Sequence, residues 1–506
     1  MGNEAQLDDL ILAIDQGTSA AKVILFDLDG RVVASAGGET LVRHPRPTWM
    51  ESDAESWWEV VSAGIRQCLA APGVSADRVR AVGICGFMHT LVAIDGAGRP
   101  LYPPMLWPDQ RSAAEAEALG AHADLFTKAV GRPTTTMLAP PRLAWLKAAH
   151  PKVLESARCF LLSKDFIRYR LTGQLATDHY DAGGTGLYSH ERGGWADEIL
   201  ELVGVDPEKM PPILRPDEVA GEVTRAAAEA TGLRPGTPVV TGSGDWFTTI
   251  VGSGCYHPAS TCFYMGTAGI LGAFKSAEEY DRLGATQYYG SVTSTGSALR
   301  WARDLFCEPL GTLDASLTGS LGGLESFERL CEDAGRSEPG AKGLLFLPHL
   351  MGERGGGVRP HARGVLFGLT LAHRRADVVR AVLEGTALWL LATTEPQVRA
   401  HDPGDLIAFG GGARSALWRQ IHASVFRRPL LVPEVVEGGA LGAAMFAAVG
   451  TGLRRSYREL GAEWVRIVGV EAPDPQLQEV YAALYADFRR LETTLAPHFV
   501  GPTGVR

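Results

Sequence analysis

Two short apolar runs flank a polar turn near the start of the chain, in the segment AIDQGTSAAKVILFD (residues 13–27). Apolar runs on either side of a short turn predict a β-hairpin, with strands over residues 11–14 and 23–26. The same strand–turn–strand pattern returns at residues 260–274, STCFYMGTAGILGAF. A hairpin repeated about half a chain apart predicts two related domains that face a cleft, with a boundary near Cys255.

The rest of the chain alternates strand-like and helix-like segments. Strand-like runs dominate the first hundred residues, and glycine-rich β-patterned segments return at residues 237–274. Apolar residues with a period near 3.6 predict helices over residues 54–70, 142–149, 375–394 and 475–495. This alternation indicates an α/β architecture rather than a helical bundle or a β-sandwich.

Size and composition limit the class of protein. The chain has 506 residues, 45% hydrophobic and 21% charged, which is an ordinary globular composition on a chain too long for a single core. We therefore expect two domains, at residues 1–254 and 255–506. The formal net charge of −10 argues against a general binder of nucleic acid or of anionic membranes.

The cysteines and the N-terminus indicate a cellular compartment. The seven cysteines are scattered, odd in number and form no C-x-x-C pair, so we expect reduced thiols rather than disulfides or a zinc site. The acidic N-terminus lacks the basic region of a signal peptide, and no apolar run approaches the length of a membrane span. A cytoplasmic protein is the expectation.

The turn of the first hairpin has the residues of a phosphate site. Gly17 permits close approach of the backbone, Thr18 and Ser19 add hydroxyl donors, and Lys22 adds a cation. Asp15 would repel a phosphate unless a divalent metal lies between them, and one carboxylate with phosphate oxygens is a common way to hold Mg²⁺. The same residues also fit a plain capped hairpin with the lysine in solvent.

Two other glycine-rich turns are candidates for nucleotide contacts. The second hairpin has Gly266 and Thr267 in its turn but no charge, so it could form a second wall of the same phosphate site. A third segment, residues 407–426, is a strand, three glycines and a helix, where glycines would let a flat ring lie against the backbone. A tight packing turn explains these glycines equally well.

A phosphate-transfer reaction also needs a base, and Asp245 is the candidate. It follows a glycine-rich turn, TGSG, and precedes an apolar helix-like run. The glycines could leave its carboxylate facing a ligand. An ordinary helix N-cap is the competing interpretation, because aspartate is common at such junctions.

With these segments in order, the sequence resembles the FGGY family of carbohydrate kinases over nearly its whole length. The hairpin at residues 13–27 is similar to the first phosphate motif of that family. Further similar segments, the first three closest to xylulokinases, are MESDAESWW (50–58), GFMHTLVAID (86–95), LWPDQR (106–111), SKDFIRYRLTGQLATDHYDAGGT (163–185), FLPHLMGERGGGVRPHARGVLFGLTLAHRRADVVRAVLEG (346–385), FGGGARSALWRQIHASVFRRPL (409–430) and EGGALGAAMFA (437–447).

The resemblance implies a fold and an activity. It implies two domains of the ribonuclease-H-like, actin and hexokinase type with a central cleft, of which the N-terminal one binds sugar and phosphate and the C-terminal one binds nucleotide. It implies phosphorylation of a sugar hydroxyl by Mg-ATP, with Asp245 as the general base and Asp15 orienting the metal. The phosphates would be held by Thr18, Ser19, Lys22, Gly266 and Thr267, and the adenosine would lie against Gly411, Gly412 and Ala413.

On the sugar side, Met88 and His89 match the xylulokinase-type pair, and Trp107 would wall the same pocket. A histidine beside a strand is otherwise more often a structural residue. The chain departs from many xylulokinases in having Trp246 after the candidate base and a glycine triplet, Gly355–Gly357, after the GER motif. A pentulose such as D-xylulose is the first expectation for the substrate, with gluconate, another ketose or a polyol as alternatives.

A different class of function also fits part of the pattern. An actin-like nucleotide switch or a chaperone would share the Asp-x-Gly-Thr hairpin, but such proteins lack the segments around Met88, Trp107 and residues 346–354. A catalytically weak sugar sensor that retains binding is a further alternative, and the intact Asp15, Lys22 and Asp245 argue against it. The expected partner is therefore a small sugar or polyol rather than a nucleic acid or a membrane, and the resemblance adds the expectation of a homodimer.

Overall fold

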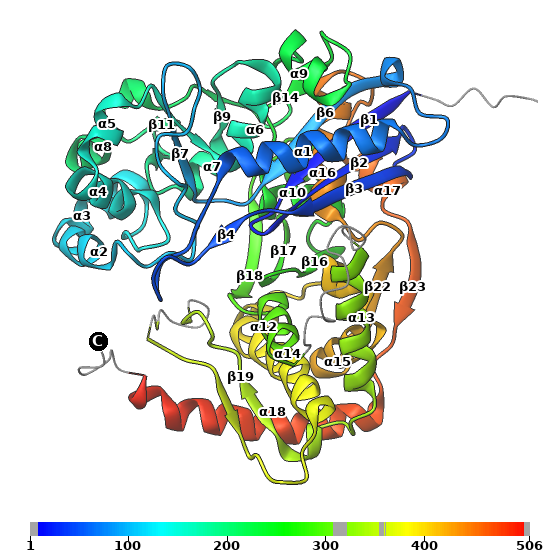
Figure 1. The fold of residues 1–506 in the computed structure, drawn as a ribbon. Coiled ribbons are helices and arrows are strands. Elements are labelled where there is room, and N and C mark those ends of the chain that lie inside the picture. Colours follow the sequence, from blue (N-terminus) through cyan, green and yellow to red (C-terminus); the bar gives the residue numbers. More distant parts are fainter. Residues whose placement is uncertain (1–8, 307–320, 354–358, 360, 500–506) are drawn as a thin grey trace, which may run out of the picture. The chain divides into compact units, whose positions relative to one another are not determined.

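The computed structural model describes residues 9–306, 321–353, 359 and 361–499 (Figure 1). They form two compact units, Met1–Gly252 with Gly439–Trp464, and Ser253–Gly438 with Val465–Arg506. The first division lies close to the expected boundary at residue 254. The expectation of one continuous C-terminal domain differs from the structure, because residues 439–464 belong to the first unit.

Glycines explain how this late segment joins the first unit. Helix α16 (Gly438–Gly450) lies so close to the first sheet that a Cβ on Gly83 would be 1.9 Å from the Ala443 carbonyl oxygen. On the same helix, a Cβ on Gly442 would be 2.0 Å from the Thr248 carbonyl oxygen. Such contacts between distant segments leave no mark in the local pattern of the sequence.

The first unit is built on one mixed sheet with the strand order β13-β14-β6-β1-β2-β3, and β15 pairs with β6 beside it. Strands β1, β2 and β3 are antiparallel neighbours, whereas β6 is parallel to β1. The strands are β1 (Leu10–Gln16), β2 (Ala20–Asp27), β3 (Val32–Glu39), β6 (Val79–Gly86), β13 (Val219–Glu222), β14 (Pro238–Val240) and β15 (Ser243–Gly244).

The hydrophobic pattern explains why the predicted hairpin forms. Every residue of β1 except Asp15 is buried, so the strand is a nearly continuous apolar run with a polar residue near its end. Helix α1 (Ala54–Leu69) covers β2 and β3 and buries Trp57 completely (Figure 1). The Asp53 side chain caps this helix by accepting a hydrogen bond from the Glu55 N–H. The predicted hairpin and the helix predicted over 54–70 are confirmed.

The second unit repeats the sheet. Its strand order is β18-β17-β16-β21-β22-β23, with β16, β17 and β18 antiparallel and β21 parallel to β16. The two units therefore share three antiparallel strands, then two parallel ones, and an antiparallel strand (β13 or β23) at the far edge of the sheet. The strands are β16 (Ser260–Met265), β17 (Gly269–Phe274), β18 (Thr286–Val292), β21 (Asp405–Phe409), β22 (Leu430–Pro433) and β23 (Ile467–Glu471).

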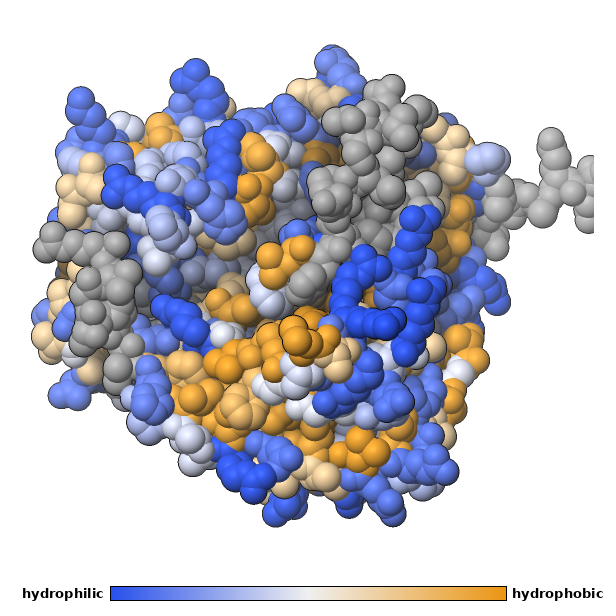
Figure 2. All heavy atoms as spheres, turned by 60° about the horizontal axis from the view of Figure 1, so that its bottom comes forward, coloured by the Kyte–Doolittle hydropathy of each residue, from blue (hydrophilic) through white to orange (hydrophobic). Residues whose placement is uncertain are grey.

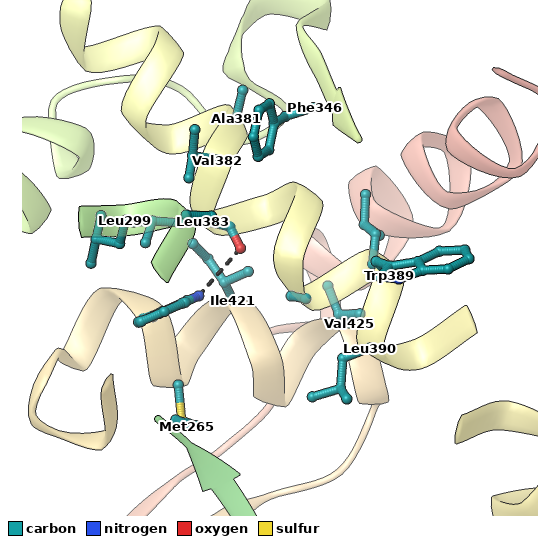
Figure 3. Close-up of a cluster of buried hydrophobic side chains, with 14 of the residues drawn as sticks. Met265, Leu299, Phe346, Ala381, Val382, Leu383, Trp389, Leu390, Ile421 and Val425 are labelled. Carbon is teal, nitrogen blue, oxygen red and sulfur yellow. Dashed lines mark hydrogen bonds between the residues drawn. The ribbon is translucent and has the colours of Figure 1, made fainter. Parts of the chain in front are cut away.

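Part of the core of the second unit lies between helices α14 (Arg375–Ala400) and α15 (Ala416–Phe426). Figure 3 shows Leu383 and Leu390 packed toward Ile421 and Val425 at this contact. The Trp418 indole N–H donates to the Leu383 carbonyl at 3.3 Å, which ties the helices together inside the core. The buried Met265, the last residue of β16, lies at the bottom of this cluster in Figure 3.

The remaining elements surround these two sheets, and two predicted helices differ at their ends. Helix α4 begins at Ala139, three residues before the predicted start, because Pro140 and Pro141 are tolerated in a first helical turn. Helix α14 continues past the predicted end at Thr394 and through Pro396 to Ala400. The other helix predicted to end the chain matches α18 (Pro475–Leu495).

The other helices are α2 (Ala113–Leu119), α3 (Ala123–Val130), α4 (Ala139–Ala149), α5 (Pro151–Ser156), α6 (Ser163–Thr172), α7 (His179–Gly184), α8 (Asp197–Val203), α9 (Arg225–Thr231), α10 (Asp245–Ser253), α11 (Ala277–Asp281), α12 (Gly296–Phe306), α13 (Leu321–Gly335) and α17 (Tyr457–Trp464). Five two-stranded sheets pair β4 (Val42–Arg43) with β5 (Glu51–Ser52), β7 (Leu91–Ile94) with β8 (Cys159–Leu162), β9 (Thr177–Asp178) with β12 (Ile213–Leu214), β10 (Tyr188–Ser189) with β11 (Gly194–Trp195), and β19 (Leu345–Leu347) with β20 (Val365–Phe367).

The surface carries some large apolar side chains. Figure 2 shows a face on which apolar residues gather beside strongly hydrophilic ones. The exposed large apolar residues of the second unit include Phe367, Leu369 and Leu371.

The predicted homodimer stays a prediction. Across the part of the chain that the structure describes, no helix is both long and apolar enough to cross a bilayer, and the six cysteines described are free and buried.

Candidate active site

Asp15 lies at the carboxyl end of β1, where the sheet register fixes its neighbours. It stands opposite Lys22 on β2 and opposite Cys85 on the parallel strand β6. The Cys85 Sγ is 3.4 Å from Asp15 Oδ1. Burial and the nearby Asp15 carboxylate raise the pKa of the Cys85 thiol, so the S–H stays protonated and donates to that carboxylate.

Asp245 begins α10 directly after β15, and β15 pairs in parallel with the end of β6. The two strands that flank β6 thus bring Asp15 and Asp245 to the same edge of the sheet. Burial raises the pKa of Asp245, and the negative charge of Asp15 raises it further, to about 7, although the Trp246 N–H donates to Asp245 Oδ1 at 2.8 Å. A carboxylate with a pKa near the working pH is suited to act as a general base.

Gly439, at the start of α16, is a part of this site that sequence reasoning missed. A Cβ at this position would lie 3.2 Å from Asp15 Oδ2 and 3.3 Å from Cys85 Sγ. Only a residue without a side chain leaves the Asp15 carboxylate undisturbed here. The segment EGGALG therefore borders the Asp15 carboxylate.

The polar turn between β1 and β2 is tied to the predicted sugar side. The Trp107 indole N–H donates to Thr18 Oγ1 at 3.2 Å. Gly17 is needed for the tight turn, because a Cβ would be 2.7 Å from the Ala20 carbonyl oxygen. Thr18, Ser19 and Lys22 are all half-buried beside Asp15, so the lysine is not a fully solvated side chain.

Met88 and His89 lie just beyond β6, in the same unit. His89 has a left-handed backbone, with φ of 69°, which is uncommon for a residue other than glycine. Its Nδ1 is 2.7 Å from the Gly184 carbonyl oxygen, which can only accept a hydrogen bond, so Nδ1 carries a proton and donates it. Met88 packs against the residue before the candidate base, since a Cβ on Gly244 would be 2.6 Å from Met88 Cγ.

A buried group of ions, also missed by sequence reasoning, braces the segment that leads to Asp245. The Lys164 Nζ is 2.7 Å from Asp165, 3.1 Å from Asp178 and 3.3 Å from Asp181. Burial alone would lower the pKa of Lys164, but the three carboxylates outweigh it and raise that pKa. Asp178 in turn accepts a hydrogen bond from the Ser243 hydroxyl at 2.7 Å, two residues before Asp245.

The candidate nucleotide residues are neighbours in the second unit. Gly266 and Thr267 form the turn between β16 and β17, and the 3₁₀ helix η5 (Gly411–Arg414) follows β21. A Cβ on Gly412 would lie 2.8 Å from the Trp418 ring and 2.9 Å from the Met265 carbonyl oxygen, so the two glycine-rich segments touch. Thr267 and Gly411 are exposed, whereas Ala413 is buried.

The predicted site residues thus fall into two groups. The first unit brings together Asp15, Thr18, Ser19, Lys22, Met88, His89, Trp107 and Asp245, and the second unit brings together Gly266, Thr267, Gly411, Gly412 and Ala413. The described residues contain no cluster of three or more His, Cys, Asp or Glu side chains that would hold a metal by themselves. The glycine triplet Gly355–Gly357 lies outside the described residues.

Two sheets of the same order, each with a polar or glycine-rich turn at the end of its first strand, define a two-domain ATPase fold. The chain belongs to the FGGY family of carbohydrate kinases, whose N-terminal domain matches residues 10–252 and whose C-terminal domain matches residues 248–451. It is a sugar kinase, and kinases of this family use ATP as the phosphate donor.

Similar proteins include kinases with more than one named substrate. The chain is 32% identical to the xylulose kinase of Escherichia coli K12, over 96% of this chain and 99% of that protein. It is 30% identical to the autoinducer-2 kinase of Escherichia coli K12 (strain DH10B), over 93% and 92%. The crystal structure of xylulose kinase from Rhodospirillum rubrum is 29% identical, with a TM-score of 0.76 over 97% of this chain and 99% of that one.

Proposed function

We propose that this kinase transfers the terminal phosphate of ATP to a hydroxyl of a pentulose such as D-xylulose. The observation that carries the proposal is the pair formed by Asp15 and Asp245, in which the second carboxylate has a pKa of about 7. The similarity to xylulose kinases at 29–32% identity supports the sugar class. Because an autoinducer-2 kinase is about as similar, the choice of sugar depends on experiment.

In this proposal Asp245 accepts the proton of the sugar hydroxyl as its oxygen attacks phosphorus. Phosphoryl transfer depends mainly on positioning and on neutralising charge, and a positioned base typically contributes about 10²–10⁴-fold in rate. A base with a pKa near 7 is ionised in a large part of the molecules at neutral pH, yet still basic enough to take the proton. Met88, His89 and Trp107 would contact the sugar.

The first unit would bind the sugar and the transferred phosphate, through Thr18, Ser19 and Lys22. Asp15 would hold Mg²⁺, which is usually bound by one or two carboxylates together with phosphate oxygens and water. The residues fit this ion, because Asp15 and Asp245 are close enough to raise a pKa by mutual repulsion and a cation would relieve that repulsion. When bound, the ion would neutralise negative charge on the phosphates.

The second unit would bind the nucleotide. Gly266 and Thr267 would lie against the phosphates, with the Thr267 N–H and hydroxyl as donors, because the Gly266 N–H donates to the Ala268 carbonyl within the turn. Gly411, Gly412 and Ala413 would lie against adenosine, and the open space around the position of a Gly411 Cβ supports close approach of a flat ring.

The test is ADP formation by the purified protein with Mg-ATP and one sugar at a time. Pentuloses, hexuloses, aldonates including gluconate, and polyols form the panel, and the rate without sugar is the control. Turnover that depends on a pentulose, at a kcat/KM at least tenfold above that for the other classes, would support the proposal. Preference for gluconate or a polyol would overturn the substrate, and fast ATP hydrolysis without sugar would favour an actin-like switch.

A further inference from the structure

Arg142, in the first turns of α4, is a buried arginine in the first unit. The residue is only 4% exposed to solvent. Its partners include five main-chain carbonyl oxygens, those of Thr136 (3.1 Å), His89 (2.7 Å), Met105 (3.3 Å), Trp107 (3.0 Å) and Met137 (2.7 Å). Neither the motifs nor the family resemblance pointed to this residue.

The N–H groups of the Arg142 guanidinium donate to each of these five carbonyl oxygens. A guanidinium has five N–H groups in a fixed planar fork. Nε donates one of the bonds, and Nη1 and Nη2 donate two each. A lysine has only three N–H donors and no planar fork, so it could not satisfy the same carbonyls. The fork joins three separate chain segments, around residues 89, 105–107 and 136–137.

One of these carbonyls belongs to a residue with an unusual backbone. His89 is held in the left-handed region, with φ of 69°, a conformation that persists only where the surroundings impose it. Arg142 Nη1 bonds its carbonyl oxygen, and its imidazole Nδ1 bonds the Gly184 carbonyl. The Arg132 Nη2 donates to the same Gly184 carbonyl at 2.9 Å, which keeps this acceptor in place.

Another carbonyl belongs to the tryptophan on the predicted sugar side. Arg142 Nη2 bonds the Trp107 carbonyl oxygen, and the indole of that residue reaches the hydroxyl of Thr18. The same guanidinium therefore sets the backbone of both aromatic sugar-side candidates.

We propose that Arg142 is a positioning residue for the sugar, which holds the His89 imidazole and the Trp107 indole in the orientation that binds substrate. The inference rests on the proposed function, since it assigns these two residues to the sugar. It predicts an effect on sugar binding that is separate from ATP binding, which a residue needed only for folding would not produce.

The first test compares Arg142→Lys with wild type, and Arg158→Lys serves as the matched control because Arg158 is exposed in the same unit. Arg142→Lys keeps the positive charge and removes the planar guanidinium with its five N–H donors. We expect the KM for sugar to rise about tenfold, with the KM for ATP within about twofold of wild type. An equal rise in both KM values, or no rise in either, would overturn the proposal.

The second test asks whether Arg142 acts through His89. In a His89→Ala background, Arg142→Lys should raise the KM for sugar less than about threefold, because one of the two groups that it positions is gone and only the Trp107 indole is left to be displaced. A full tenfold effect in both backgrounds would contradict the inference. Melting curves of each variant, and ADP binding followed by tryptophan fluorescence, identify any variant that is merely unfolded.

The third test needs no activity. In protein labelled with ¹⁵N-histidine, wild type should show His89 as the tautomer protonated at Nδ1, and Arg142→Lys should show a mixture of tautomers. An unchanged single tautomer would overturn the positioning role. If the wild-type protein phosphorylates no sugar in the panel, the proposed function fails, while this spectrum still decides whether Arg142 controls the imidazole.

Discussion

The β1–β2 turn and the β16–β17 turn occupy the same place in two sheets of the same order, but they contain different chemistry. One residue before the end of its strand, the first sheet has Asp15 and the second has Tyr264. Asp15 faces Lys22 across the hairpin, whereas Tyr264 faces Ile270. A Cβ on Gly266 would be 2.2 Å from the Tyr264 ring, so the second turn is shaped by an aromatic side chain and a glycine.

This comparison distinguishes what the shared sheet order determines from what the residues at each turn determine. The sheet order positions a turn at the carboxyl end of the first strand in either unit, and such ends are where α/β proteins commonly bind ligands. In the first unit, burial and, after it, the negative charge of Asp15 at that end raise the pKa of the neighbouring Asp245 carboxylate. In the second unit, no atom lies within 4 Å of the position of a Cβ on Gly411, which leaves room for a ligand against the backbone there, whereas atoms of the protein itself fill the space beside Gly266 and Gly412.

The largest expected effect comes from removing the base of the first unit. Asp245→Asn should lower kcat by about 10²–10⁴-fold, because the amide cannot accept the proton of the sugar hydroxyl. The KM for ATP should stay within about threefold if the second unit binds the nucleotide. Steady-state assays of ADP formation measure both values, and full turnover by this variant would remove Asp245 from the role of base.

The same variant should be more stable than wild type at pH 8. The folded-state pKa of about 7 lies above the ordinary value of 3.8, so ionising Asp245 costs the fold stability as the pH rises from about 4 through 7. Because the side chain is half-buried, we expect a gain of roughly 1–2 kcal/mol at pH 8 and none near pH 4. Denaturant unfolding at the two pH values gives this difference, and equal stability at pH 8 would contradict it.

A methyl group at Gly439 should disturb the first site without touching the second. Gly439→Ala brings a Cβ within 3.2 Å of Asp15 Oδ2, which shifts that carboxylate. We expect kcat to fall by about 10–100-fold, since misplacement on the ångström scale is costly in a reaction that depends on position. Gly120→Ala, which meets no atom within 4 Å in the same unit, is the control and should retain wild-type kcat.

The two turns should also differ in their dependence on pH. Activity that needs ionised Asp245 should give a kcat/KM that falls about tenfold per pH unit below about 7 and levels off above it. Asp15→Asn should move this limb to lower pH, because it removes the second cause of the raised pKa. Binding of ADP should be nearly flat between pH 6 and 8, since the turn Met265–Gly269 has no ionisable side chain. A flat profile of kcat/KM would oppose the assigned base.

The smallest expected effect is in the second unit. In Gly412→Ala the new Cβ would meet the Trp418 ring at 2.8 Å and the Met265 carbonyl oxygen at 2.9 Å. Overpacking of about 1 kcal/mol at this contact should raise the KM for ATP by roughly three- to tenfold and leave the KM for sugar unchanged. Gly335→Ala, exposed and free of contacts within 4 Å, is the matched control. A change in the KM for sugar instead would contradict the assignment of the sugar to the first unit and of the nucleotide to the second.

Much of the fold could be predicted from local pattern. The apolar runs of β1 and β2, the repeat of this hairpin at β16 and β17, and helices α1 and α18 all follow from hydrophobic period and turn residues. These signals extend over fewer than about 25 residues, which is why they can be seen without the tertiary structure.

Long-range contacts were predicted less well. The segment 439–464 was assigned with its sequence neighbours, but its helix α16 packs on β6 through glycines. The role of Gly439 beside Asp15 and the five carbonyl contacts of Arg142 also escaped prediction. The sequence around a glycine or an arginine does not indicate which atoms from distant segments lie next to it in the fold.

The sequence by itself determined which residues could perform chemistry at each turn, because polar and glycine residues interrupting apolar strands are visible locally. The tertiary structure alone decided that Asp15 and Asp245 flank the same strand, that their charges interact and that the pKa of one rises to about 7. The physical reason is that electrostatic and packing energies depend on distance in space, and the pairing of β1, β6 and β15 sets those distances between segments far apart in the chain.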